Sequence, residues 1–344
     1  MGKKNSSSLL AIKVNLFQLV ILLALTGVLV YFGTRYTLEK KADLLASYSS
    51  SPVGSDSGCK YDVKRVQGYK YIKPILFVDQ ECEGSTLQFI KSDLINYIDE
   101  CKSKGEINSV AVYLKDYQSN DYFSINGNEK FMPASLMKVP FLITFLKMSE
   151  KYPGLLQEKY TFNKDYSKTK TPEVLAKSIE QGKSYTVEEL LQYMIQYSDN
   201  NATYLLSEHI DNAMLNAVFT DFGLQAPQLG SVNLFMSAEE YSRFMRSLVN
   251  GTYLTKANSE KAIALLTTSV FDKGIQHDLP KDISIAHKFG ESGNENEMQL
   301  HESGIVYLEN KPYLITVMTK GSNKTHLEQV IQRISSKVYQ SLKS

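Results

Sequence analysis

The stretch FMPASLMKVP, residues 131–140, places two reactive side chains among apolar neighbours. Proline is favoured in the first turn of a helix because it has no N–H to lose there, so a helix is expected to begin at Pro133, with Ser135 in its first turn. Positions i and i+3 share a helix face, so Lys138 can reach the Ser135 hydroxyl. Apolar surroundings and the positive end of the helix dipole both lower a lysine pKa, and a neutral lysine can take the serine proton. Pro140 predicts a kink in this helix.

Two further motifs follow this S-x-x-K pattern, which alone would also fit a surface lysine. In MIQYSDNNATYLL, Ser198-Asp199-Asn200 comes after a helical run, a position that by itself also suits a turn with a capping residue. In IAHKFGES, Lys288 is expected on a strand, where alternation puts Lys288 and Gly290 on one face of small residues. Such a face suits a cleft that admits a ligand carboxylate, although an isolated strand lysine is more simply an exposed one.

Together, and in this order, S-x-x-K, S-D-N and K-x-G resemble the signature of the active-site serine hydrolases that include class A β-lactamases and penicillin-binding proteins. The chain is most similar to the class A β-lactamase-related serine hydrolases, in which A-S-L-x-K-V-P, S-D-N and H-K-F-G occur together, over roughly residues 85 to 344. The resemblance implies that Ser135 is the acylated nucleophile and Lys138 its general base. It also implies that Ser198 relays a proton to the leaving nitrogen.

The same resemblance implies a set of substrate-binding residues. Asn200 would hold the amide side chain of the substrate, and Lys288 would bind its carboxylate beside Gly290. The backbone N–H groups of Ser135 and Glu291 would form the oxyanion hole, which stabilises the transition state by several kcal/mol.

One departure from the family pattern concerns the substrate. Phe289 stands in the third motif where most members have Thr or Ser, so the hydroxyl that usually helps to hold the substrate carboxylate is missing. We therefore expect the ring either to narrow the cleft for penicillins or to suit a different ligand.

A second departure concerns hydrolysis of the acyl-enzyme. Class A β-lactamases carry an E-x-x-L-N loop whose Glu activates the attacking water, and the closest string, residues 212–216, has Asn in place of that Glu and falls in a predicted helix. Glu239 and Glu240 lie at a better position, but Ser237-x-x-Glu240 is typical of a capping box, so capping is the expected role of Glu240. The sequence thus predicts machinery for acylation without the usual machinery for deacylation.

The periodicity of the folded region predicts an α/β (α+β) domain. Its antiparallel five-stranded sheet is flanked by N- and C-terminal helices, and an all-helical subdomain lies beside it. The expected elements are a helix over 87–101, a hairpin over 109–117 and 121–126, a largely helical middle over about 133–265, strands over 282–290, 302–310 and 312–320, and a helix over about 325–342.

The N-terminal part of the chain is expected to lie outside this domain. Residues 14–33 form a run of 20 residues without a charge, long enough to cross about 30 Å of hydrocarbon. Lysines before this run favour a cytoplasmic N-terminus, and the absence of a small-x-small cleavage site favours a retained signal anchor over a cleaved signal peptide. The predicted order is a cytoplasmic tail 1–13, a transmembrane anchor 14–33, a flexible linker 34–58, an N-terminal extension 59–84 and the serine hydrolase domain 85–344.

The composition and the remaining reactive residues argue against nucleic-acid binding, metal binding and a second catalytic site. The net charge of +1 indicates no nucleic-acid partner. Three cysteines suit an oxidising compartment, and a bridge from Cys59 to Cys82 with Cys101 buried on a helix is one possible pairing. The five histidines show no spacing for a metal site, and no cofactor is expected. A His301-Glu302-Ser303 triad would consist of sequence neighbours without evident geometry, and His287 is expected to be a packing residue.

These observations predict a single-pass protein of the cell membrane with its catalytic domain on the extracytoplasmic side. Its expected activity is hydrolysis of a β-lactam or related amide through an acyl-enzyme on Ser135. The alternatives are a D,D-peptidase acting on cell-wall peptides and a penicilloyl-binding sensor that acylates without turnover. The expected partners are a small β-lactam or cell-wall peptide and, through residues 14–33, a lipid bilayer.

Overall fold

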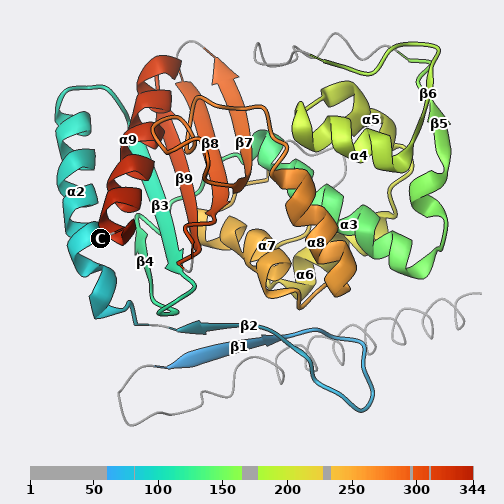
Figure 1. Cartoon of the computed structure of the whole chain (residues 1–344), viewed down its shortest axis with the longest axis horizontal. Helices are drawn as coiled ribbons and strands as arrows, with labels where there is room; N and C mark the ends of the chain where they lie inside the picture. The colour runs from blue at the N-terminus through green and yellow to red at the C-terminus, as the bar shows by residue number, and fades with distance from the viewer. Residues whose placement is uncertain are drawn as a thin grey trace, which may run out of the picture. The chain divides into compact units, whose positions relative to one another are not determined.

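A five-stranded antiparallel sheet lies at the centre of the folded domain (Figure 1). The computed structural model of the chain describes residues 60–80, 82–164, 177–227, 234–294, 297–309 and 311–343, all within one compact unit, Val53–Ser344. The strands run in the order β4-β3-β9-β8-β7, so β4 and β7 are the edges. Their bounds are β3 Ser109–Asp116, β4 Tyr122–Ile125, β7 Ile285–Asn294, β8 Glu297–Val306 and β9 Tyr313–Gly321. The predicted fold class is confirmed.

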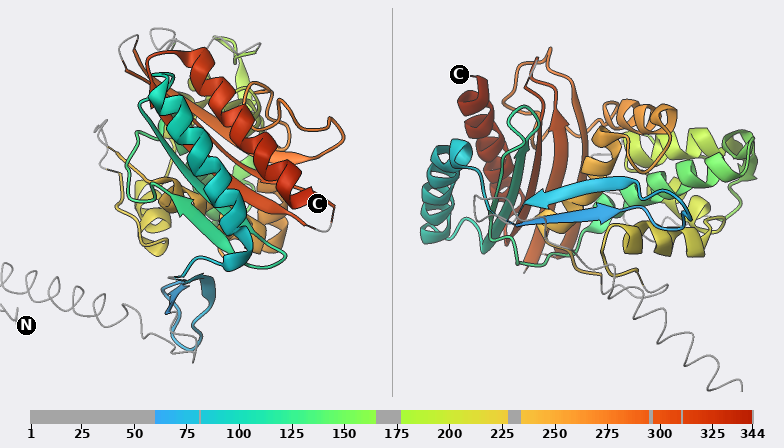
Figure 2. Two further views of the ribbon diagram at one scale, coloured as in Figure 1. Left: turned by 90° about the vertical axis from the view of Figure 1, so that its left-hand side faces the viewer. Right: turned by 90° about the horizontal axis from the view of Figure 1, so that it is seen from below.

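Both faces of the sheet are covered, because successive side chains of a strand point to opposite faces. Val112 and Leu114 of β3 belong to the core beneath α2 (Gln88–Ser103) and α9 (Lys324–Lys343), the two terminal helices that lie side by side in Figure 2. Tyr113, between them, joins the core of the helical region on the other face. The terminal helices predicted from apolar spacing are thus present on one face of the sheet.

The hairpin formed by β7 and β8 is longer than predicted. Strand β7 continues to Asn294 and β8 begins at Glu297 rather than at 302, with these two residues paired across the strands. Residues 291–297 are polar and carry no strand signal, and the alternation of Met298 and Leu300 with polar neighbours is too short to predict a strand; pairing with the neighbouring strand extends the ladder. Gly293 makes the turn possible, since its φ is +100° and a Cβ at this position would lie 2.0 Å from the carbonyl oxygen of Glu297.

The middle of the chain is largely helical, as predicted, and packs against the opposite face of the sheet (Figure 1). Two short strands, β5 and β6, form a separate pair at its outer side. The elements are α3 Lys138–Lys151, β5 Lys159–Thr161, β6 Ser184–Thr186, α4 Val187–Gln196, α5 Asn200–Ser207, α6 Asn212–Asp221, α7 Ala238–Asn250 and α8 Lys256–Leu266.

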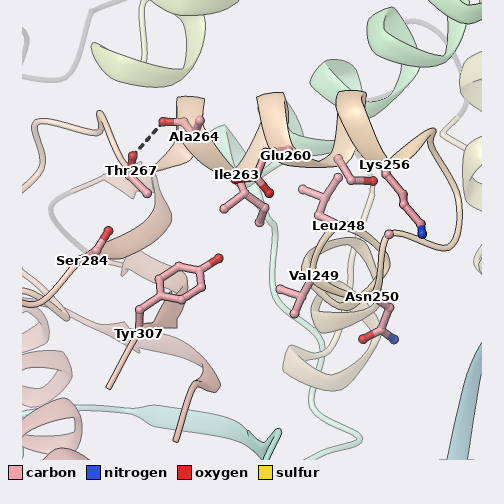
Figure 3. Close-up of a pocket in the computed structure, with 12 residues that line it drawn as sticks. Leu248, Val249, Asn250, Lys256, Glu260, Ile263, Ala264, Thr267, Ser284 and Tyr307 are labelled. Carbon is pink, nitrogen blue, oxygen red and sulfur yellow. Dashed lines mark hydrogen bonds between the residues drawn. The ribbon is translucent and has the colours of Figure 1, made fainter. Parts of the chain in front are cut away.

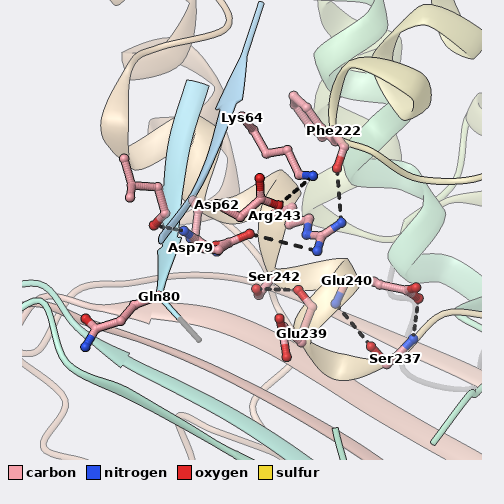
Figure 4. Close-up of polar contacts among 12 residues, drawn as sticks. Asp62, Lys64, Asp79, Gln80, Phe222, Ser237, Glu239, Glu240, Ser242 and Arg243 are labelled. Atoms are coloured by element: carbon pink, nitrogen blue, oxygen red, sulfur yellow. Dashed lines mark hydrogen bonds and ion pairs between the residues drawn. The ribbon is translucent and has the colours of Figure 1, made fainter. Parts of the chain in front are cut away.

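A second two-stranded sheet, made of β1 (Tyr61–Arg65) and β2 (Ile75–Gln80), packs against α7. The Arg246 guanidinium of α7 is 2% exposed and pairs with Asp79 of β2 at 2.5 Å. Arg243, about one turn before Arg246 on α7, also pairs with Asp79 (Figure 4), and the distance between the two charged groups is 3.9 Å. A buried ion pair therefore links this hairpin to the main domain.

The N-terminal predictions fall largely outside the described residues. None of the helices in the described ranges is long and apolar enough to cross a bilayer, and the predicted anchor at 14–33 lies outside those ranges. Cys82 is disulfide-bonded, while Cys59 is outside the described residues. Cys101 is free and buried on α2, which confirms its predicted place.

Candidate active site

The segment that carries Ser135 is a tight turn, not the first turn of a regular helix. Ala134–Met137 forms a 3-10 turn, and the α-helix α3 begins only at Lys138. Ala134 has a φ of +49°, a left-handed conformation that costs an L-residue about 1–2 kcal/mol. The expectation that a helix starts at Pro133 is therefore wrong, because a left-handed residue directly after the proline interrupts the helical path.

The predicted kink at Pro140 also needs correction. Because α3 begins at Lys138, Pro140 is its third residue and lies in the first turn. The backbone N–H groups of a first turn have no intrahelical partner, so a proline there removes no hydrogen bond. The helix instead continues without interruption to Lys151, and its N-terminal turn places Lys138 inward.

The S-D-N motif forms the corner between α4 and α5. Ser198 has a φ of +53°, so it too is a non-glycine residue in the left-handed region. Asp199 caps α5 by accepting from the backbone N–H of Asn201 at 2.9 Å, and its other oxygen accepts from the N–H of Ile179, also at 2.9 Å. The capping role considered for this motif is thus carried by Asp199, which leaves the side chains of Ser198 and Asn200 to face the site.

The edge strand β7 lies directly against the nucleophile turn. A Cβ added to Gly290 would lie 2.5 Å from the carbonyl oxygen of Pro133 and 3.0 Å from the backbone nitrogen of Leu136. Real Cβ atoms do not approach backbone this closely, so glycine is required for the contact. The third motif therefore brings a strand into close contact with the turn that carries Ser135.

Four of the candidate side chains form one hydrogen-bonded cluster. The Lys138 ammonium donates to the Ser198 hydroxyl at 3.0 Å, to the Ser198 carbonyl and to Asn200 Oδ1 at 2.8 Å. From the opposite side, Lys288 Nζ donates to the same Ser198 hydroxyl at 2.8 Å. Ser198 Oγ thus accepts from two lysines, so its own proton is directed elsewhere.

Burial changes the acid–base behaviour of both lysines. Lys138 is 4% exposed, and its desolvation lowers its pKa from 10.5 to about 7, although the nearby Asp199 carboxylate opposes the shift. Desolvation also lowers the pKa of the fully buried Lys288 well below its usual value, and the charge of Lys138 adds to this effect. Near neutral pH, Lys138 therefore exchanges a proton readily, which is the property required of a general acid or base.

Within the described residues, Lys138 directs its hydrogen bonds to the second motif and not to the Ser135 hydroxyl. An ammonium has three N–H donors, and these three contacts use all of them. A neutral amine has only two N–H groups and one lone pair. Deprotonation of Lys138 would thus release one contact and supply the acceptor that Ser135 needs.

Phe289 does not lie where the sequence suggested. Its ring is 2% exposed and stacks on Phe271 with 4.1 Å between ring centroids, in the core on the side of the terminal helices. Lys288 Nζ lies 4.1 Å from the centre of the ring. Because the same Nζ bonds to Ser198, the buried ring lies directly beside the site, on its core side. The expectation that the ring narrows the cleft is not what the structure shows.

Glu291 offers its backbone and not its carboxylate to the site. Its side chain accepts from Lys324 of α9 at 2.8 Å, on the face opposite the nucleophile turn. Since β7 is an edge strand, one row of its backbone groups faces away from β8. This arrangement is compatible with an oxyanion hole that includes the Glu291 N–H.

Neither of the candidate acids for deacylation faces Ser135. Glu240 forms the capping box with Ser237, as predicted (Figure 4), and it also pairs with Lys130. Glu239 points to the hairpin side, where it lines a small cavity with Asp79. The segment 222–237, which connects α6 to α7, contains no Asp or Glu at all.

His287 and His301 make structural hydrogen bonds and do not form a catalytic triad. His287 Nδ1 lies 2.6 Å from Glu302 Oε1, and both side chains are buried, in line with the predicted packing role. His301 bonds instead to the carbonyl of Met132, close to the nucleophile turn. Gln299 bonds to the N–H of the same Met132, and no sequence pattern had singled it out.

A cavity of about 570 Å³ lies between α7, α8 and the start of β7, and none of the candidate site residues lines it (Figure 3). No group of three or more His, Cys, Asp or Glu side chains in the described part of the chain is arranged to hold a metal ion.

A Ser-Lys pair, a second serine between two lysines and an edge strand against the nucleophile define a serine hydrolase of the β-lactamase type. The family model described as the Beta-lactamase enzyme family matches residues 92–342, and the chain belongs to this family.

Solved structures share the fold. PBP-A is 23% identical over 73% of this chain and 96% of its own, with a TM-score of 0.61. A mutant of PBP-A in an acyl-enzyme complex with penicillin G is 21% identical over 74% of this chain and 96% of its own, with a TM-score of 0.62. A β-lactamase from Chitinophaga pinensis DSM 2588 is 20% identical over 72% of this chain and 99% of its own, with a TM-score of 0.62. No curated protein gives a significant match.

Proposed function

We propose that the protein opens a β-lactam or related amide through an acyl-enzyme on Ser135, and that this acyl-enzyme is long-lived. The observation that carries the proposal is the Ser198 hydroxyl, which accepts hydrogen bonds from both Lys138 and Lys288. This arrangement provides a path for a proton from the nucleophile to the leaving group.

In the proposed acylation, neutral Lys138 takes the Ser135 proton as Oγ attacks the carbonyl carbon. The carbonyl oxygen becomes an oxyanion beside the backbone N–H groups of Ser135 and Glu291. Ser198 then gives its proton to the leaving nitrogen, and Lys138 returns a proton to Ser198 across their 3.0 Å contact. The C–N bond breaks, the acyl group stays on Ser135, and Lys138 is neutral again.

Slow deacylation follows from what surrounds the site. Hydrolysis of the acyl-enzyme requires a base to activate water on Ser135, and a carboxylate is the usual choice. The segment 222–237 has none, while Glu239 and Glu240 are engaged elsewhere. Among the three functions predicted from the sequence, these observations favour the penicilloyl-binding sensor that acylates without turnover over an efficient β-lactamase.

The proposed location is the outer side of the cell membrane, with residues 14–33 as a single-pass anchor. The uncharged run of 20 residues supports this proposal, as does the disulfide at Cys82, since disulfides persist in oxidising compartments. Extraction of membranes at alkaline pH should leave the full chain in the pellet. Release of the intact chain into the soluble fraction would contradict the anchor.

Intact-mass spectrometry with benzylpenicillin tests the proposed chemistry. The domain should gain the mass of one penicilloyl group, and the adduct should persist for many minutes after free drug is removed. Ser135→Ala should abolish the adduct, whereas Ser284→Ala, a change of an exposed serine directly before β7, should not. Fast loss of the adduct with steady drug turnover would identify an efficient β-lactamase.

Absence of an adduct at millimolar penicillin would exclude β-lactams as substrates. The same panel should therefore include a peptide thioester ending in D-alanine, which shares the acyl-transfer chemistry but lacks the lactam ring. Release of thiol that depends on Ser135 would then support a peptidase. Reaction with neither compound would overturn the proposed function.

A further inference from the structure

Phe131 and Met132, which lie just before Pro133 and the nucleophile turn, are held by hydrogen bonds on both sides of the backbone. Phe131 and Met236 exchange two backbone hydrogen bonds of 2.9 Å each. The next residue, Met132, donates its N–H to Gln299 Oε1 at 3.1 Å. Its carbonyl accepts from His301 Nε2, also at 3.1 Å. Both backbone groups of Met132 are thus held by side chains of β8.

The tautomer of His301 follows from its second contact. The backbone N–H of Thr319 donates to His301 Nδ1 at 3.2 Å, and an N–H cannot accept, so Nδ1 carries no proton. The ring proton therefore lies on Nε2 and points at the Met132 carbonyl. Full burial lowers the pKa of His301 to about 4, so the ring is neutral at physiological pH and keeps one donor and one acceptor.

The position of these contacts coincides with backbone strain. Ala134, two residues after Met132, is left-handed, and Ser135 follows it directly. Strained conformations of this kind persist only where the surrounding structure holds the chain on both sides. On the far side of the turn, Tyr241 donates to the carbonyl of Leu136 at 3.0 Å. On the near side, the contacts of Gln299 and His301 with Met132 serve this purpose.

We propose that Gln299 and His301 are positioning residues, which hold Met132 so that the strained turn presents the Ser135 hydroxyl to Lys138 and to the substrate. This inference rests on the proposed role of Ser135 as the nucleophile. Neither residue touches the reacting atoms, so both act through the backbone of the turn. Their distance in sequence from Met132, 167 and 169 residues, explains why no local motif reveals them.

The alternative is a purely structural role, in which these buried polar groups contribute to stability alone. Variants of Gln299 distinguish the positioning role from a purely structural role. Gln299→Met has a similar size but leaves the Met132 N–H without its acceptor. Gln299→Glu keeps an acceptor oxygen, and Lys320, paired with Gln299 across β8 and β9, supplies a compensating charge. Ser303→Ala, a change on the same strand β8, is the control, because it removes the buried 2.7 Å contact of Ser303 with Thr316 of β9 and leaves the contacts of Gln299 and His301 with Met132 in place.

Two readouts are measured on the folded domain, namely the rate constants of Ser135 acylation by benzylpenicillin and hydrogen exchange at the Met132 amide. Gln299→Met should lower the limiting acylation rate about 10- to 100-fold, since a misplaced reacting group costs about this much. The drug concentration at half-maximal rate should change little, and Met132 should exchange faster. Gln299→Glu should restore most of the rate, and Ser303→Ala should lower the melting temperature without changing either readout.

Each outcome decides the inference separately from the proposed function. If the wild type is acylated and Gln299→Met reacts at the same rate, the positioning role is wrong. If Ser303→Ala slows acylation as much as Gln299→Met does, the effect is one of general stability. If the wild type is acylated by no probe, the proposed function fails, but Met132 exchange still shows whether Gln299 holds the turn. His301→Phe, which keeps a ring against Phe131, provides a second variant with the same expectation.

Discussion

Acylation of Ser135 should depend on pH through Lys138. Because burial lowers the pKa of Lys138 to about 7, the neutral form that can accept a proton is already abundant at neutral pH. A lysine with the usual pKa of about 10.4 would be neutral in only about one molecule in 2,500 at pH 7. The environment of Lys138 therefore raises the concentration of the active base by about three orders of magnitude.

The sign and size of the pH effect follow from this value. Below its pKa Lys138 is charged and cannot act as a base, so the acylation rate falls as pH decreases. About a tenth of the molecules carry neutral Lys138 one unit below the pKa, so the rate at pH 6 should be about tenfold lower than the plateau above pH 8. The midpoint of the curve should lie near the pKa of about 7.

The assay is the rate of penicilloyl-enzyme formation at fixed, subsaturating benzylpenicillin, followed by rapid quench and intact mass from pH 5.5 to 9. Lys138→Arg should be inactive throughout, since a guanidinium remains charged at every pH in this range. Lys147→Arg, a change on the same helix α3 at a partly exposed position, should reproduce the wild-type curve. A rate that is independent of pH, or one that still rises tenfold per unit between pH 8 and 9, would refute the argument that burial prepares Lys138 as the base.

Three substitutions test other parts of the structure. Gly290→Ala should slow acylation on the order of 100-fold, because its Cβ would lie 2.5 Å from the carbonyl oxygen of Pro133; a wild-type rate in the penicillin assay would contradict this contact. Arg246→Met leaves the Asp79 carboxylate with only the 3.9 Å contact of Arg243 and should cost about 3 kcal/mol of unfolding free energy in urea titration, with most of the loss recovered when Asp79→Leu is added. If Asp79→Leu restored none of the lost unfolding free energy, the Arg246–Asp79 ion pair would not be what holds the hairpin. Phe289→Thr should cost about 3 kcal/mol or more, since the ring is buried; faster penicillin acylation without loss of stability would instead place the ring in the cleft.

Much of the fold was accessible from local sequence rules. The apolar spacing of α2, the capping box of Ser237 and Glu240, and the buried Cys101 all follow from residues no more than a few positions apart, and all three are present. The errors lie where local rules meet long-range pairing. Strand β8 begins at Glu297 because β7 pairs with it, and the short alternation of Met298 and Leu300 with polar neighbours did not by itself fix this start.

The candidate residues of the site were likewise visible, but their geometry was not. The order of the three motifs and the alternation along β7 indicated a Ser-Lys site with Lys288 and Gly290 on one face. The sequence did not show that Ser198 lies between two lysines, which are 60 and 90 residues away along the chain. It also suggested a cleft position for Phe289, whereas stacking on Phe271 places the ring in the core.

By itself, then, the sequence determined which side chains are available for chemistry and which segments form helices and strands, since these depend on residue type and on spacing over a few positions. Only the tertiary structure decided how the chain is bent at Ala134 and Ser198, two left-handed residues that local preference disfavours. Contacts from distant segments hold these conformations, including those of Gln299 and His301 with Met132. The register of a sheet sets such contacts, and that register depends on the whole domain at once.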